Sequence, residues 1–107
     1  MHTPNFEKLF YIKTFELLSQ TRSTEVRFLG YLIRFMSYDN RVYFERAEVA
    51  NSIGCSVDTI TNLTKDLVFV DLMRPNGKNR YMINPQCICK GPADHFWSLV
   101  DDFNRLS

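Results

Sequence analysis

The sequence predicts a mainly α-helical fold that contains one small β-hairpin. Three observations predict it. Most of the chain carries apolar residues at helical spacing, residues 45–69 have the spacing of two helices joined by a tight turn, and an Asn-Gly turn lies between two strand-like segments in residues 72–83. The 107 residues, of which 45% are hydrophobic and 23% charged, have the size and composition of one globular domain over residues 1–107.

Two helices and a short strand are expected in the first half of the chain. Residues 5–19 repeat their apolar side chains with the period of a helix. A second helix begins at Ser23 or Thr24, either of which can cap it, and ends near residue 37. Its apolar face is wide, which predicts a central and well-buried helix. Residues 42–44 then read as a strand.

The segment 45–69 has the register of a helix-turn-helix. Ala50 is small enough for two helices to cross closely, and Gly54 can adopt the left-handed backbone of the turn between them. Ser56 is the expected N-cap of the second helix, which runs from Val57 to about Phe69. The positions expected to point inward are Val49, Ile53, Ile60 and Leu63.

A hairpin over residues 72–83 follows, and Gly91-Pro92 precedes a last amphipathic helix over residues 92–106. Helix-turn-helix followed by a hairpin is the order of a winged helix-turn-helix, in which the hairpin is the wing. The predicted fold is therefore a winged helix-turn-helix with an extra C-terminal helix.

This fold predicts contact with double-stranded DNA, with the second helix of the motif in the major groove. Asn62 can pair bidentately with adenine, and the threonines can touch a thymine methyl group or a phosphate. The alternative is the solvated polar face of an ordinary helix. The outward residues proposed to contact DNA are Ser56, Asp58, Thr59, Thr61, Asn62 and Lys65.

The wing is expected to contribute phosphate contacts through Arg74, Lys78 and Arg80, the first and last sharing one face of the hairpin. The alternative is a hairpin tip that only improves solubility. The formal net charge is only +1, but residues 73–91 hold four bases and no acid, whereas residues 92–107 hold three acids and one base. Such segregation is typical of a chain in which one element faces phosphate.

The C-terminal helix offers more apolar surface than one small domain needs. It either packs over the first two helices or pairs with a second copy, and we favour a homodimer because a two-fold dimer matches two DNA half-sites. The residues proposed for dimerisation are Phe96, Trp97, Val100 and Phe103.

The sequence offers no catalytic or metal-binding pattern. His2 and His95 lie far apart, Asp101-Asp102 is typical of the solvated face of a helix, and no phosphate-binding glycine loop follows a strand. We therefore expect no enzymatic activity, no cofactor and no small-molecule substrate. The chain has no segment long enough to span a membrane and no secretory signal, and its three cysteines are expected to be reduced thiols in a cytoplasmic protein.

Several stretches resemble the RepL-type replication proteins of bacterial plasmids. They include residues 8–11, 36–40, 48–50, 54–56 and 59–60, and the more diagnostic ending Tyr81-Met82-Ile83-Asn84-Pro85 with Lys90-Gly91. The resemblance implies a winged helix that binds repeated DNA at an origin, in the initiation or maintenance of plasmid replication, and it implies neither a nickase nor a polymerase.

Three functions are compatible with these features. The first is a sequence-specific DNA-binding protein in plasmid replication initiation, maintenance or copy control. The second is a plasmid- or phage-encoded transcriptional repressor, which shares every physical feature of the first. The third is a winged-helix module for protein–protein contacts, which predicts no salt-dependent binding to DNA.

Overall fold

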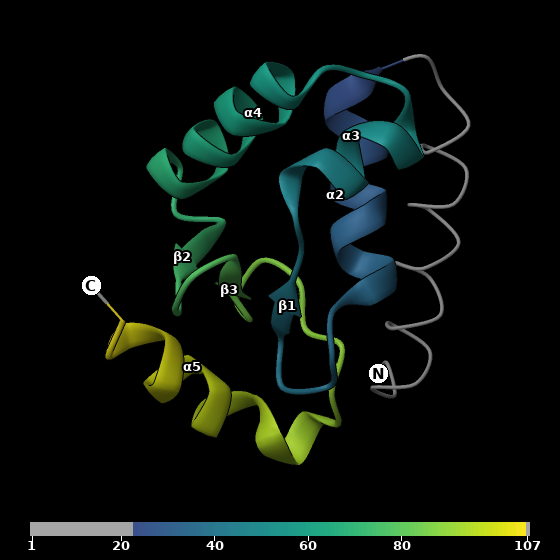
Figure 1. Cartoon of the computed structure of the whole chain (residues 1–107). Coiled ribbons are helices and arrows are strands. Elements are labelled where there is room, and N and C mark those ends of the chain that lie inside the picture. Colours follow the sequence, from purple (N-terminus) through teal and green to yellow (C-terminus); the bar gives the residue numbers. More distant parts are fainter. Residues whose placement is uncertain (1–22, 107) are drawn as a thin grey trace.

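The computed structural model describes residues 23–106 (Figure 1). The helix expected over residues 5–19 lies outside the described residues. Within them, helix α2 spans Thr24–Phe35. It begins where the Ser23 hydroxyl accepts a hydrogen bond from the Val26 amide at 3.4 Å, so the first of the two expected caps is the one used. No helix in this part of the chain is long and apolar enough to cross a bilayer.

Strand β1, at Arg41–Tyr43, leads into helix α3 at Arg46–Ile53 and helix α4 at Val57–Phe69. Strands β2, at Met73–Pro75, and β3, at Arg80–Ile83, form the expected hairpin. The isolated strand expected over residues 42–44 in fact joins this hairpin, since β1 pairs antiparallel with β3 and the sheet order is β1-β3-β2. The fold is therefore mostly helical with a small three-stranded sheet.

The sheet is covered on both faces. On one face, Met73 and Ile83 belong to the core that α2, α3 and α4 also build, around Phe28, Val49 and Ile60. On the other face, Met82 packs against Leu99 and Phe103 of helix α5, which spans Phe96–Asn104 after a short 3₁₀ turn at Ala93–His95. Figure 1 shows α5 beneath the sheet, on the side away from α3 and α4. The expected helix over residues 92–106 is thus shorter and lies against the wing.

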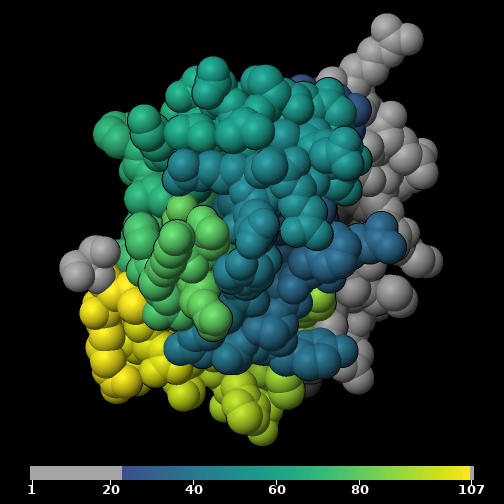
Figure 2. Space-filling view, in the orientation of Figure 1, coloured from purple at the N-terminus to yellow at the C-terminus, as the bar shows by residue number. Residues whose placement is uncertain are grey.

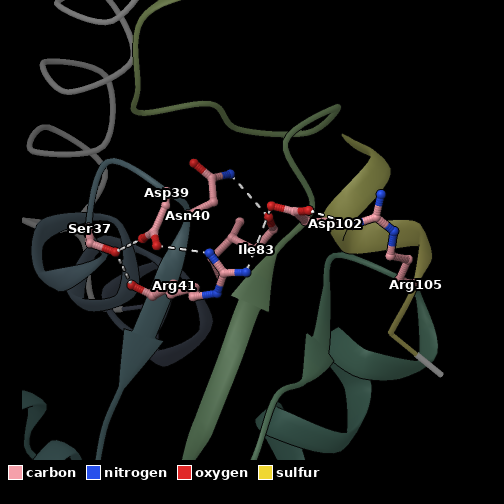
Figure 3. Close-up of polar contacts among 7 residues, drawn as sticks. All are labelled: Ser37, Asp39, Asn40, Arg41, Ile83, Asp102 and Arg105. Atoms are coloured by element: carbon pink, nitrogen blue, oxygen red, sulfur yellow. Dashed lines mark hydrogen bonds and ion pairs between the residues drawn. The ribbon is translucent and has the colours of Figure 1, made fainter. Parts of the chain in front are cut away.

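Asn40 joins three segments from a fully buried position. Its amide nitrogen donates to the carbonyl oxygens of Ile83 at 3.0 Å and Ile88 at 2.6 Å, and its amide oxygen accepts from the backbone N–H of Lys90 at 3.2 Å. Asn40 also adopts a left-handed backbone with φ 64°. Figure 3 shows its side chain directed toward Ile83 in β3. This one side chain therefore fixes the turn before β1 to the segment after the sheet.

The Lys90 side chain caps the C-terminal end of α2. Its ammonium donates to the carbonyl oxygens of Ile33 at 3.0 Å, Arg34 at 3.2 Å and Met36 at 2.7 Å. The last carbonyls of a helix have no partner within the helix and carry its partial negative charge. A lysine from more than fifty residues further along the chain thus satisfies the C-terminal end of α2.

Arg41 connects β1 to α5 at the surface. Its guanidinium donates to the Asp39 carboxylate at 2.8 Å and lies 3.9 Å from that of Asp102, which in turn accepts a hydrogen bond from Arg105 at 3.1 Å (Figure 3). Ser37 also donates to Asp39. Exposed ion pairs of this kind contribute little stability each, so the burial of Leu99, rather than these charges, holds α5 in place.

Candidate nucleic-acid interface

The turn between α3 and α4 has the geometry that the sequence predicts. Gly54 ends α3 with φ 77° and ψ 50°, and its N–H donates to the Ala50 carbonyl at 2.9 Å. A Cβ atom at Gly54 would meet nothing within 4 Å, so glycine is needed there for its backbone angle and not for space. Val49, Ala50 and Ile60 are buried where the two helices cross, as expected.

Ser56 caps α4 as predicted. Its hydroxyl accepts a hydrogen bond from the Thr59 amide at 3.1 Å, and the two hydroxyl groups lie 2.8 Å apart. The hydroxyl of Thr61 donates to the Val57 carbonyl at 3.1 Å. The hydroxyl hydrogen of Thr61 is therefore used within α4, which leaves its methyl group and the acceptor side of its oxygen for another molecule.

Asp58, Asn62 and Lys65 form one exposed stripe along α4. They are spaced by four and three residues, which places them on the same side of the helix. Thr59 and Thr61 are half-buried beside this stripe. The stripe carries one acid and one base, so it has hydrogen-bonding groups to select a ligand but little net charge to attract a polyanion.

The wing presents two exposed bases, Lys78 and Arg80. Between the strands, the Asn76 amide donates to the Arg80 carbonyl at 2.8 Å, and Gly77 has φ 117°, which confirms the tight hairpin predicted from Asn-Gly. Helix α4 packs against β2, so the wing lies beside the outward helix of the motif. Figure 2 shows the green wing next to the blue segment that contains β1, below the teal helices.

Arg74 does not present a free cation, and this corrects the sequence prediction. The register places Arg74 on the same face of the hairpin as Arg80, as expected, but this is the face that α5 covers. The guanidinium forms two hydrogen bonds with the Asp71 carboxylate, donates to the Phe103 and Leu106 carbonyls at 3.0 and 2.9 Å, and lies 4.4 Å from the Phe103 ring centre.

The hydrogen bond between Asp71 and Arg74 lowers the pKa of the carboxyl group and raises that of the guanidinium, so both stay charged. Arg74 therefore ties the C-terminal end of α5 to β2. Because Lys90 is bound to the end of α2, two of the four bases in residues 73–91 donate hydrogen bonds to backbone carbonyls of other segments. The basic character predicted for this segment is reduced to Lys78 and Arg80.

The four residues proposed for dimerisation divide into two pairs. Val100 and Phe103 are buried within the single chain, so they present little surface to a second copy. Phe103 packs on Met82 of the sheet, which differs from the expected alternative of packing over the first two helices. Trp97 is 70% exposed, and Phe96 is half-buried with its ring edge-to-face on Trp97 at 5.0 Å. Only this aromatic pair remains on the outer side of α5.

Tyr43 lies beside the wing and was not among the residues singled out in the sequence. Its ring is 53% exposed, and the guanidinium carbon of Arg80 lies 5.6 Å from the ring centre. The strand pattern in the sequence indicates an outward Tyr43, because alternate side chains of a strand point to opposite faces. Its apolar neighbours Val42 and Phe44 are indeed buried. The sequence alone does not show that Arg80 is its cross-strand partner.

The family comparison matches nearly the whole chain. The model for Firmicute plasmid replication proteins, RepL, matches residues 2–107. The chain belongs to the RepL family. It is thus a protein of plasmid replication, as the resemblance implied. Neither the curated proteins nor the solved structures gave a match.

Four residues of the stretches that resemble RepL proteins have structural roles in the described part of the chain. Asn40 and Lys90 make the buried and helix-capping hydrogen bonds described above, and a Cβ atom at Gly91 would lie 2.4 Å from the Tyr38 carbonyl oxygen. Asn84 donates to the Asp71 carbonyl at 3.0 Å and accepts from the Gln86 amide at 3.0 Å. These four residues have structural roles, whereas the RepL-like residues Ser56 and Thr59 lie at the start of the candidate helix α4.

Proposed function

We propose that this RepL protein binds double-stranded DNA sequence-specifically and acts in plasmid replication initiation, maintenance or copy control. The observation that carries the proposal is an exposed polar stripe on α4, a helix that contacts the first strand of a hairpin presenting the exposed bases Lys78 and Arg80. A helix of this size fits the major groove, and a basic hairpin next to it reaches the adjacent backbone. The proposal includes no catalytic step and no cofactor.

Four residues of α4 and its N-cap have distinct parts in the proposal. Asn62 pairs with adenine, the methyl group of Thr61 contacts a thymine methyl, and Lys65 contacts a phosphate. Asp58 accepts from cytosine or stays in solvent near the positive end of the helix. The side chain of Ser56 caps the helix and orients the first turn toward a phosphate.

Lys78 and Arg80 supply the phosphate contacts of the wing. Since the stripe on α4 is nearly neutral, most of the salt-dependent affinity comes from these two side chains and from a second subunit. Contacts to phosphate fix the orientation of a protein on DNA but carry little sequence information. The wing therefore provides affinity, and α4 provides selection.

A homodimer would present two copies of α4 to two half-sites. We infer that the Phe96–Trp97 pair is the part of α5 that meets the second copy, since Trp97 exposes most of its large apolar ring. The pair lies on the helix that packs beneath the sheet, away from α3 and α4 (Figure 1), so pairing there leaves the DNA-facing elements uncovered. Two-fold pairing matches a palindromic site.

Footprinting on fragments of the plasmid that encodes the chain tests this function. We expect protection of the replication origin, in two half-sites separated by about one helical turn. Protection confined to a promoter would favour the transcriptional repressor instead. Absence of any protected sequence would contradict sequence-specific DNA binding, and would leave the winged helix as a module for protein contacts.

A further inference from the structure

The Arg80 side chain is held on two sides. A Cβ atom placed on Gly77 would lie 3.5 Å from Cδ of Arg80, so the aliphatic part of Arg80 passes over the glycine. Its guanidinium carbon lies 5.6 Å from the ring centre of Tyr43, its direct partner across β1 and β3. A cation over an aromatic ring is stabilised by the quadrupole of the ring. Arg80 is thus more ordered than an arginine at a free hairpin tip.

Tyr43 is itself tied to the start of the helix-turn-helix. Its hydroxyl donates to the Glu45 carboxylate at 3.0 Å, and Glu45 is the N-cap residue of α3. This hydrogen bond raises the pKa of Tyr43, because the Glu45 carboxylate favours the protonated hydroxyl that donates to it. The adjacent backbone is fixed as well, because the Phe44 amide donates to the Asn79 carbonyl at 3.0 Å.

These contacts form a series from the wing to the residue that precedes α3. It runs from Arg80 through the Tyr43 ring to the carboxylate of Glu45, whose backbone leads into α3. An exposed arginine otherwise loses side-chain entropy when it binds a phosphate, and ordering it beforehand reduces that loss. The same series sets the position of the wing cation relative to the motif that carries α4.

We propose that Tyr43 is a positioning residue for DNA contact, which holds the Arg80 guanidinium at a fixed place relative to the helix-turn-helix. The proposal rests on the proposed function, because it assumes that Arg80 binds a phosphate of duplex DNA. The chemistry recognised is a backbone phosphate, so the effect of Tyr43 is independent of base sequence.

The test measures binding of a fluorescein-labelled duplex of mixed sequence over a series of KCl concentrations. The variants are Tyr43→Leu, Tyr43→Phe, Arg80→Ala and the double variant Tyr43→Leu with Arg80→Ala.

We expect Tyr43→Leu to weaken binding roughly threefold. We expect Tyr43→Phe, which keeps the ring but loses the hydrogen bond to Glu45, to bind between Tyr43→Leu and the unchanged chain. The double variant is expected to bind no more weakly than Arg80→Ala alone, because the ring then has no cation to hold. Tyr38→Leu, which removes an exposed tyrosine outside this series, is the matched control.

A second readout needs no DNA. In NMR spectra of the free protein, the ring current of Tyr43 shifts the side-chain N–H resonance of Arg80, and this shift is expected to persist in Tyr43→Phe and to disappear in Tyr43→Leu. Additive losses in the double variant, or equal losses in the Phe and Leu variants, would overturn the positioning role while DNA binding stands. Failure of the unchanged chain to bind the duplex, with the ring-current shift present, would overturn the proposed function and with it the role in DNA contact.

Discussion

Replacing Asn40 with alanine is expected to lower the free energy of unfolding by about 4 kcal/mol. The substitution removes three hydrogen bonds from a fully buried position and leaves the Ile83 and Ile88 carbonyls and the Lys90 amide without this partner. Each buried group left unsatisfied costs about 1 kcal/mol or more. Alanine also tolerates the left-handed backbone at φ 64° less well than asparagine, at a further cost of about 1 kcal/mol.

Urea unfolding followed by circular dichroism measures this loss. Asn40→Gly is the informative companion, because glycine accepts the backbone angle and isolates the lost side-chain bonds. Asn79→Ala is the matched control, since Asn79 has φ 58° but is only half-buried, and we expect it to cost about 1 kcal/mol. Equal losses at positions 40 and 79 would show that the buried bonds of Asn40 contribute nothing.

Gly91→Ala is expected to be the second severe substitution, with a loss of about 3 kcal/mol. The new Cβ atom would lie 2.4 Å from the Tyr38 carbonyl oxygen, a backbone atom that moves only if its turn moves. That turn contains Asn40, and the residue before Gly91 is the lysine that caps α2. Displacement at Gly91 therefore disturbs two further sets of contacts.

Gly54→Ala provides the contrast by thermal unfolding. Gly54 has φ 77° but open space around it, so alanine there should cost only the backbone strain of about 1 kcal/mol. Gly91 has little room for a side chain, whereas Gly54 has an unusual backbone angle. The two variants therefore distinguish the cost of a steric clash from the cost of backbone strain. A melting temperature for Gly91→Ala at or above that of Gly54→Ala would mean that the Tyr38 turn yields without cost.

Local signals predicted much of the fold. The caps at Ser23 and Ser56, the left-handed turn at Gly54 and the Asn-Gly hairpin each depend on a few neighbouring residues, and all four are present. The inward positions of α3 and α4 follow from helical spacing in the same way.

Contacts between distant segments were not predictable from one sequence. Arg74 was predicted to be a wing base, but besides the nearby Asp71 its partners are carbonyls 29 and 32 residues later in the chain. Lys90 counted as part of a basic segment, although its partners lie 54 to 57 residues earlier. A charge pattern does not distinguish a base that binds its own chain from one that stays free. For this reason Arg74 was predicted as a phosphate contact and is now excluded from the candidate site.

Apolar spacing also did not predict which surface α5 packs against, because that surface comes from a distant segment. Phe103 and Trp97 lie on the same amphipathic helix, yet one is buried on the sheet and the other is 70% exposed. The spacing shows that an apolar face exists, while the surface that covers it depends on the register of the sheet. The position of Met82 on the face toward α5 settles this for Phe103.

Binding of a labelled duplex at increasing salt tests most directly whether α4 and the wing form a DNA interface. We expect the logarithm of the association constant to fall linearly with the logarithm of salt concentration. Arg80→Ala should reduce the slope by about 1 and weaken binding evenly across sequences, whereas Asn62→Ala should keep the slope and lose about 1–3 kcal/mol of preference for one site. No binding at low salt, or binding that both substitutions leave unchanged, would contradict this interface.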